Sequence, residues 1–171
     1  MTIQLLGAIF IVVGSGLEGF RRAYMLQKHQ RVLINLANAF SWMQNEIVKR
    51  QTPILDIVKD QQLRKGDVEL LYEKFNHHLV VSQFLLRDAW IEAVKEYGEY
   101  SLLNQEDLEW IERIGEAIQQ FDRQSIDKEL SFVIDVLRNR HHEARNRAIQ
   151  FGKLYKTLGV MGGVLLVLLL S

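Results

Sequence analysis

Apolar positions in the middle of the chain recur at helical spacing, whereas both ends of the chain are apolar without interruption. From Arg21 to Gln51 the apolar residues follow one another mainly every three or four positions, which is the period of one helix face. These positions are Leu33, Leu36, Ala37, Phe40, Met43 and Ile47. A second seam of the same kind runs from residue 130 to residue 155, and we expect Ser125 to cap its helix. Its members are Leu130, Val133, Leu137, His141, Ala144, Ala148, Phe151 and Tyr155.

Turn signals divide the segment between these two helices into four shorter helices. Pro53 is the only proline, and Thr52 before it can N-cap a helix in which Pro53 takes the first position. Further helices are expected at 67–80, at 83–97 and at 104–119, the last opened by Asn104 with Asp107 three residues on. The pattern predicts an all-α fold: an antiparallel helical bundle of about six helices, of which the first and the last are long.

Both long helices are expected to continue into membrane segments. The runs Ile3–Leu17 and Leu158–Ser171 carry no charged side chain. Each is shorter than the ~20 residues of an ordinary span, so full spanning and shallow insertion both stay open. A cleaved signal peptide is the competing interpretation of the first run, but Arg21 and Arg22 follow that run instead of preceding it. We expect an N-terminal transmembrane segment at 1–20, a cytoplasmic helical bundle at 21–156 and a C-terminal transmembrane segment at 157–171.

Basic residues flank both apolar runs on the side of the chain's middle. Four follow the first run and six precede the second: Arg21, Arg22, Lys28 and Arg31, then Arg138, Arg140, Arg145, Arg147, Lys153 and Lys156. Basic flanks stay in the cytoplasm. This predicts a cell-membrane protein that has the lipid bilayer as a partner, with the bulk of its chain cytoplasmic and both termini outward.

Small residues mark places where helices could touch, because they let two backbones approach closely. Gly159 and Gly163 form a GxxxG motif, Ser15 and Gly19 form a small-xxx-small pair, and two alanines, Ala144 and Ala148, lie on the second seam. Motifs of this kind also arise by chance in membrane helices. The candidate helix-packing residues are Ala144, Ala148, Gly159 and Gly163.

The segment from Asp88 to Asp135 is acidic, with thirteen Asp and Glu against four Lys and Arg. We expect these acids to form a crown held away from anionic lipid headgroups. A partner-docking face is predicted there, with acids that steer encounter and a tryptophan that anchors. Its candidate residues are Glu106, Glu109, Trp110, Glu112 and Glu116. The alternative is that the acids only keep the bundle soluble. A net charge of zero argues against nucleic acid as a partner.

Residues that could do chemistry do not converge. The chain has no cysteine, which excludes disulfides and thiolate zinc sites. The pairs His77-His78 and His141-His142 are adjacent, and neighbours on a helix point about 100° apart. No nucleotide-binding loop, serine elbow or HExxH motif is present. We therefore predict that the protein is not an enzyme, with no catalytic residue, no metal site and no cofactor.

Four stretches of the chain carry a family resemblance through their order and spacing. They are LLGAIFIVVGSGLEGF near the N-terminus, NEIVKRQTPILDI at Asn45–Ile57, IGEAIQQFDRQSI at Ile114–Ile126 and KLYKTLGVMGGVLLVLLLS at Lys153–Ser171. Together they resemble the stage III sporulation protein AB family of endospore-forming bacteria over essentially the whole chain. That family in turn resembles the F-type platform protein of type II secretion.

The resemblance implies a non-enzymatic component of the secretion-like channel apparatus between mother cell and forespore, located in the mother-cell membrane. The implied partners are a cytoplasmic secretion-type ATPase (stage III sporulation protein AA) and the other proteins of the same sporulation operon. Two functions stay open: a platform or adaptor that couples this ATPase to the channel, and a membrane-tethered sensor or regulatory helical module. A sensor should have a pocket with convergent polar groups, whereas an adaptor should have a filled core. Whether the protein is a homo-oligomer is also left open.

Overall fold

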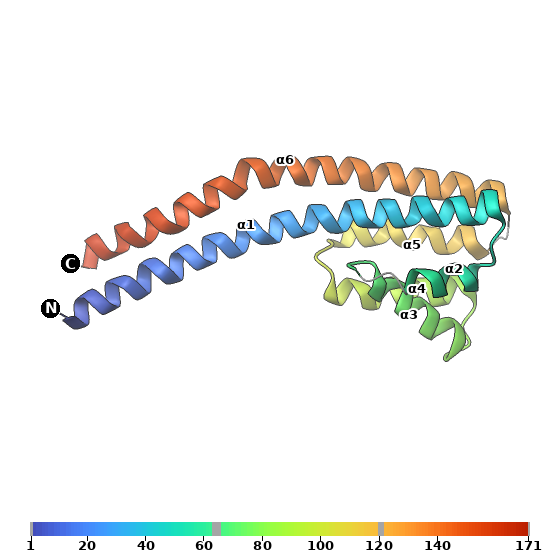
Figure 1. Cartoon of the computed structure of the whole chain (residues 1–171), viewed down its shortest axis with the longest axis horizontal. Coiled ribbons are helices and arrows are strands. Elements are labelled where there is room, and N and C mark those ends of the chain that lie inside the picture. The colour runs from blue at the N-terminus through green and yellow to red at the C-terminus, as the bar shows by residue number, and fades with distance from the viewer. Residues whose placement is uncertain (1, 63–65, 120–121, 171) are drawn as a thin grey trace. The chain divides into compact units, whose positions relative to one another are not determined.

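A computed structural model of the chain describes residues 2–62, 66–119 and 122–170 (Figure 1). Over these residues it is all-helical, with six α-helices, one short π-helix and no strand. The helices are α1 (Thr2–Asn45), η1 (Glu46–Arg50), α2 (Ile54–Gln62), α3 (Glu69–Val80), α4 (Leu86–Tyr100), α5 (Gln105–Gln119) and α6 (Arg123–Leu170). The predicted fold class and the order of two long and four short helices are confirmed for this part of the chain.

The chain divides into two compact units, and both long helices contribute to each. Residues Arg31–His141 form one unit, called the bundle unit below, and Met1–Gln30 with His142–Ser171 form the other, called the terminal unit. In each unit α1 and α6 run antiparallel. Gln44 donates to the Asp127 side chain at 2.7 Å in the bundle unit, and Gly19 meets Gly159 in the terminal unit.

The bundle unit is built around one tryptophan. Trp90 of α4 is fully buried, and its ring centroid lies 6.0 Å from that of Phe40, 6.4 Å from that of Tyr72 and 5.0 Å from that of Phe75. Its indole nitrogen donates to the Ile111 carbonyl oxygen at 2.8 Å, so the ring's one polar atom is satisfied inside the core. The predicted stripe of α1 faces this core, since all six of its residues, from Leu33 to Ile47, are buried.

The end of α1 differs from the prediction at Thr52. The last turn widens into η1, and Gln51 ends it with a left-handed backbone at φ 59°. The Thr52 hydroxyl donates to the Glu46 carboxylate at 2.8 Å, and the Pro53 carbonyl accepts the first bonds of α2. Thr52 is therefore not the N-cap of α2. The cause is the nearly buried Glu46 carboxylate, which Arg50 also contacts at 2.9 Å.

Two further helix starts rest on local side-chain bonds. Asn104 and Asp107 form a reciprocal capping box, in which the Asp107 amide donates to Asn104 Oδ1 at 2.8 Å and the Asn104 amide donates to Asp107 Oδ2 at 3.2 Å. This confirms the predicted start of α5. The predicted cap of α6 is wrong by three residues, because Asp122 accepts from the Ser125 amide at 2.9 Å. Ser125 donates to the cap instead of being it.

The terminal unit packs small residues inward and large apolar residues outward. Among its residues with described side chains, every buried one is glycine or alanine: Gly16, Gly19, Ala23, Ala144, Ala148, Gly152 and Gly163. Large apolar side chains are exposed along both helices, among them Leu17, Phe20, Ile149, Leu154, Leu158, Met161, Leu165 and Leu168. The predicted seam of α6 therefore holds as far as Ala148 and fails at Phe151, which is 43% exposed while Gly152 is buried in its place.

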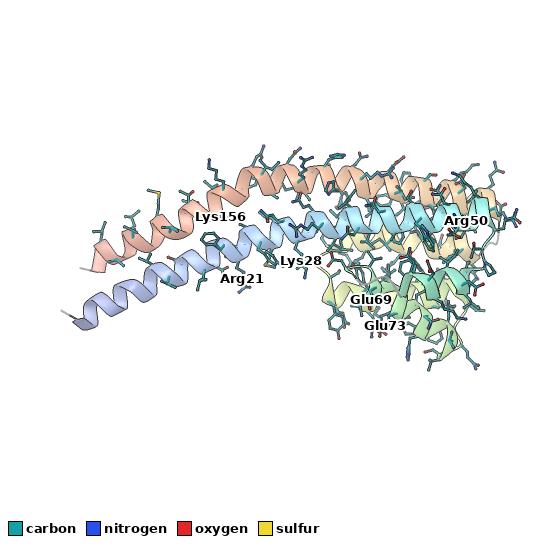
Figure 2. The ribbon with its side chains drawn as sticks, in the orientation of Figure 1. Arg21, Lys28, Arg50, Glu69, Glu73 and Lys156 are labelled. Atoms are coloured by element: carbon teal, nitrogen blue, oxygen red, sulfur yellow. The ribbon has the colours of Figure 1, made fainter. Side chains whose placement is uncertain are left out.

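Basic side chains accompany this apolar surface (Figure 2). Arg21, Lys28 and Lys156 are exposed, and the Lys156 ammonium lies 5.4 Å from the centre of the Phe20 ring. Over the described residues, no helix combines the length and the apolar character needed to cross a membrane. The transmembrane segments predicted at 1–20 and 157–171 are therefore not supported.

Candidate docking surfaces

Some of the predicted docking carboxylates of α5 already form ion pairs within the chain, and others do not. Glu106 receives Arg140 Nη2 at 2.6 Å, and Glu116 lies 3.7 Å from Arg87. Glu109 is exposed and Glu112 is half-buried, and neither forms an ion pair with a described residue. The two carboxylates left for a partner are thus those of Glu109 and Glu112.

Trp110 belongs to a surface cluster that joins α5 to α6. Its ring meets Phe132 in a T-shaped contact at 5.5 Å. The Arg113 guanidinium lies 5.2 Å from the Trp110 ring centre and 5.1 Å from the Phe132 ring centre, and its Nε donates to Glu129 at 2.7 Å. Trp110 is half-buried by these contacts, so a partner would meet the cluster as a whole instead of a free indole.

Charge crowding shapes the electrostatics of this face. Burial raises the pKa of the Glu112 carboxyl above its ordinary value of 4.5, and the neighbouring Glu109 carboxylate raises it further. A cation brought close to these two carboxylates would relieve that repulsion.

Behind the face, α5 is tied to α6 by a buried charge. Asp107 is fully buried and receives the Arg140 guanidinium, which reaches Glu106 as well. Sequence reasoning identified Asp107 as a capping residue, but it did not identify this pair, whose members lie 33 positions apart.

The predicted helix-packing residues lie between α1 and α6 of the terminal unit. A Cβ on Gly159 would lie 2.7 Å from the Ser15 carbonyl oxygen, and a Cβ on Gly19 would collide with the Tyr155 carbonyl oxygen. Ala144 and Ala148 are 6% and 7% exposed, and Gly163 is buried. The structure thus brings Gly159 against both members of the small-xxx-small pair, with no room for a side chain.

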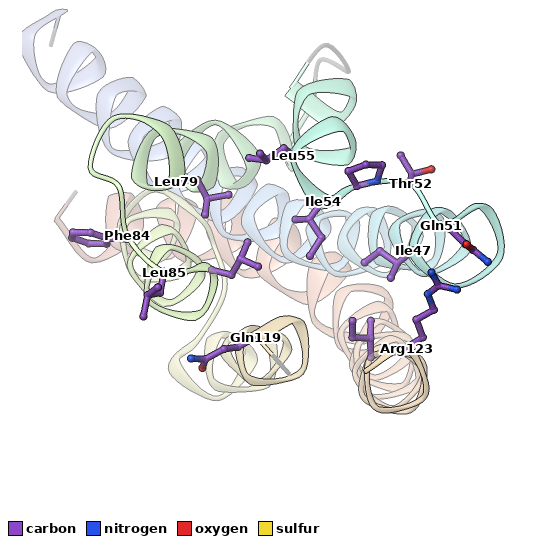
Figure 3. A pocket seen from close by; sticks show the side chains of 13 residues that line it. Ile47, Gln51, Thr52, Ile54, Leu55, Leu79, Phe84, Leu85, Gln119 and Arg123 are labelled. Atoms are coloured by element: carbon purple, nitrogen blue, oxygen red, sulfur yellow. The ribbon is translucent and has the colours of Figure 1, made fainter. Parts of the chain in front are cut away.

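Sequence reasoning missed an apolar groove on the bundle unit (Figure 3). It has a volume of about 820 Å³ and lies between the α3–α4 turn on one side and the α1–α2 turn with the start of α6 on the other. Leu79, Phe84 and Leu85 line the first side, and Ile47, Ile54 and Ile126 line the second. The sequence signal was the stretch LVVSQFLL at 79–86, where apolar residues continue through a turn that should be polar.

The described residues assemble no evident catalytic or metal centre. No three His, Asp or Glu side chains among them are placed to hold a metal ion. His78 Nε2 pairs with Glu96 at 3.0 Å, and the His78 ring stacks on Phe84, so this histidine has contacts of a structural kind.

The chain matches a described protein family over nearly its whole length. The profile of the family described as stage III sporulation protein AB (spore_III_AB) matches residues 4–171. Stage III sporulation protein AB of Bacillus subtilis (strain 168) is 28% identical over 171 residues, which cover 98% of this chain and 99% of that protein. A solved structure of a stage III sporulation protein AB has a TM-score of 0.65 at 20% identity, covering 71% of this chain and 96% of that one.

Proposed function

This chain belongs to the stage III sporulation protein AB family, and from that premise we propose that it is a non-enzymatic membrane adaptor of the sporulating cell. In this proposal it is part of the secretion-like apparatus between mother cell and forespore. The terminal unit is held in lipid of the mother-cell membrane, and the bundle unit binds a cytoplasmic secretion-type ATPase and other sporulation proteins. The observation that carries the proposal is the arrangement of the terminal unit, with glycine and alanine inside and large apolar side chains outside.

Such an arrangement suits lipid better than water. An exposed apolar surface of this extent is rare on soluble domains, where it marks a contact with another protein or a membrane. Helices that associate in lipid gain little from burying large apolar groups, and they pack through small residues that bring the backbones close. The exposed basic residues Arg21, Lys153 and Lys156 suit anionic headgroups at the cytoplasmic surface. Both helices then enter the lipid from the same side.

An adaptor explains the bundle unit better than a ligand sensor does. Its centre is filled by Trp90 and the aromatic side chains around it. The groove is lined mainly by apolar side chains, and its polar members Gln51, Thr52, Gln119 and Arg123 come from three separate segments (Figure 3). The Thr52 hydroxyl already donates to Glu46. A specific small-molecule site needs a few polar groups aimed at the ligand.

The acidic face of α5 is the proposed contact for the ATPase. Glu109 and Glu112 are the carboxylates that no described cation pairs with, and their mutual repulsion is relieved by a basic partner surface. The cluster of Trp110, Arg113 and Phe132 beside them offers the rigid aromatic area typical of binding hot spots.

The test is a charge reversal that leaves the internal ion pairs intact. Glu109→Lys with Glu112→Lys in the full chain, reconstituted in nanodiscs, should weaken binding of the sporulation ATPase about tenfold or more at low salt and flatten its salt dependence. Glu73→Lys with Glu99→Lys makes the same change in charge on exposed positions of α3 and α4, and it should have little effect beyond the long-range field. Equal binding by both double variants would reject the acidic face as the contact.

The membrane part of the proposal has a separate test. Full-length chain should float with vesicles that contain anionic lipid, and Leu158→Glu with Leu165→Glu, which change exposed side chains, should abolish flotation while the bundle unit stays folded. Flotation that survives these changes would mean that the apolar surface is not what lipid contacts.

A further inference from the structure

We infer that the apolar groove of the bundle unit is a docking site for an amphipathic helix of a partner protein, with a carboxylate on that helix facing Arg123. The inference is independent of the acidic face of α5, because none of the candidate docking residues of that face lines the groove. It is carried by the exposed apolar rim, by the strained turns that hold the rim, and by the charge of the lining.

Exposed apolar side chains of the bundle unit concentrate at this groove. Leu55 is 46% exposed, Phe84 44% and Leu85 67%, and all three line it. Val80 and Val81, at 55% and 67% exposed, stand on the turn that carries Phe84 and Leu85. The floor is closed by Ile47 and Ile126, which are buried. Large apolar side chains around a depression with an apolar floor are typical of surfaces that a partner covers.

On each side of the groove one residue has a left-handed backbone conformation, which non-glycine residues rarely adopt. Gln83 has φ 55° and Gln51 has φ 59°, and they are the only described non-glycine residues with positive φ. A left-handed conformation is unfavourable for a non-glycine residue, because its Cβ atom crowds the backbone carbonyl oxygen. Gln83 lies on the turn that presents Phe84 and Leu85, and Gln51 ends the helix that contributes Ile47. Strain that shapes both sides of one groove is typical of a functional site.

Contacts within the chain hold the apolar wall in place. The Phe84 amide donates to the His78 carbonyl oxygen at 3.1 Å, and the Phe84 ring stacks on the His78 imidazole at 5.4 Å between centroids. His78 is in turn held by Glu96, with 3.0 Å between Nε2 and the carboxylate. A wall that needs no ordering on binding leaves more of the contact energy as affinity.

The lining specifies the charge of the occupant. Arg123 is the one charged side chain that lines the groove, and it makes no ion pair with any described residue. A carboxylate on the partner would complement it, and a lysine or arginine there would be repelled. The occupant is therefore apolar along one face and acidic at the position beside Arg123.

The form of the groove favours a helix over a strand or a small molecule. The described residues include no strand whose edge could accept an added strand, so recognition by β-augmentation is not available. Rim residues that are close to half exposed leave the groove open to solvent, whereas small-molecule sites enclose most of the ligand surface. An amphipathic helix that inserts apolar side chains at i, i+3 or i+4, and i+7 matches an open apolar depression.

A phage-displayed library of helical peptides of about 15 residues, with variable apolar and charged positions, tests the inference. Full-length chain in nanodiscs is the bait, and affinities of the selected peptides are measured by fluorescence anisotropy. Selected peptides should carry spaced apolar residues and an Asp or Glu. Leu85→Glu should weaken them at least about tenfold, since it puts a charge on the apolar rim. Tyr100→Glu, at an apolar side chain of similar exposure (70%) outside the groove lining, should change binding less than about twofold.

The proposed contact between Arg123 and a carboxylate of the partner helix is tested by exchanging the two charges. Arg123→Glu should weaken the acidic peptides about fivefold or more, and replacing the peptide's acid by lysine should restore binding to that variant alone. The inference is overturned if the selected peptides bind the parent and Leu85→Glu equally, or if binding does not respond to the charge exchange. Sedimentation tests the other occupant, because a parent dimer that Leu85→Glu converts to monomer would assign the groove to a second copy of this chain. Tryptophan emission from the bundle unit, which includes the buried Trp90, verifies that each variant is folded.

Discussion

Replacing Asp107 by asparagine tests the tie between α5 and α6 with a change of one atom. The carboxylate has two acceptors in use, since Oδ1 receives Arg140 and Oδ2 receives the Asn104 amide. Asparagine keeps one acceptor and turns the other into a donor, so one of these two N–H groups loses its partner in a fully buried place. Arg140 is not stranded, because its Nη2 keeps Glu106 at 2.6 Å.

The expected cost is about 2–4 kcal/mol. Loss of one charge-assisted hydrogen bond accounts for about 1.5–3 kcal/mol, and the donor left facing another donor adds to it. Removing one partner of a buried ion pair usually costs about 3–5 kcal/mol of stability. The cost here is expected to be lower, because Glu106 still neutralises Arg140. Asp122→Asn is the matched control, since Asp122 is exposed and asparagine is as good an N-cap as aspartate.

Tryptophan fluorescence is the suitable readout. Trp42, Trp90 and Trp110 are the only tryptophans, and all three lie in the bundle unit. Full-length chain in micelles is titrated with urea, where m-values of ~1–3 kcal/mol/M convert the expected loss into a midpoint shift of about 1–2 M. An Asp107→Asn midpoint that coincides with that of the parent and of Asp122→Asn would refute the reasoning. The buried pair would then contribute nothing beyond what a neutral amide supplies.

Three further changes probe other contacts. Thr52→Val keeps the shape of the side chain and removes the hydroxyl that donates to Glu46, so the urea midpoint should fall by the equivalent of about 1–2 kcal/mol, and Thr52→Ser should recover part of it. Glu112→Gln should raise the melting temperature at pH 7: the raised pKa means that ionised Glu112 opposes folding, and the gain should vanish as the pH falls below 4.5, where Glu112 is protonated in both states. Gly16→Cys with Val160→Cys should form a disulfide in this cysteine-free chain, because a Cβ on Gly16 lies 3.8 Å from Val160 Cγ2. Adding Gly159→Leu should abolish that bond by forcing the helices apart, and a bond that persists would contradict the close approach at Ser15.

The sequence predicted what depends on neighbours along the chain. The α1 stripe and the capping box of Asn104 with Asp107 rest on spacings of three and four, and both were found as expected. Thr52 was misassigned although it is local, since nothing in the pattern indicates that η1 would bring the Glu46 carboxylate within its reach. The Thr52 hydroxyl binds the Glu46 carboxylate instead of capping α2.

What the sequence did not predict depends on contacts between distant segments. Asp107 and Arg140 meet only once α5 and α6 pack, and the groove exists only because the α3–α4 turn stands opposite the start of α6. The seam of α6 failed at Phe151 for a different reason. Its period was taken to mean burial of large residues, whereas the terminal unit buries glycine and alanine and turns the large residues outward.

The terminal unit is made of two segments that are distant in the sequence, and this sets an order of events during biosynthesis. Its two segments lie on either side of the bundle unit along the chain, so Arg31–His141 is translated after the first segment and before the second. At ~5–20 residues per second this interval is on the order of ten seconds. Within the bundle unit α2 packs on α3, α3 on α4 and α4 on α5, all neighbours along the chain, so these contacts can form as the chain emerges. The face of α1 that carries Gly16, Gly19 and Ala23 has no helix to meet until the end of α6 leaves the ribosome. The α1–α6 contact of the terminal unit therefore cannot form until the bundle unit has been translated.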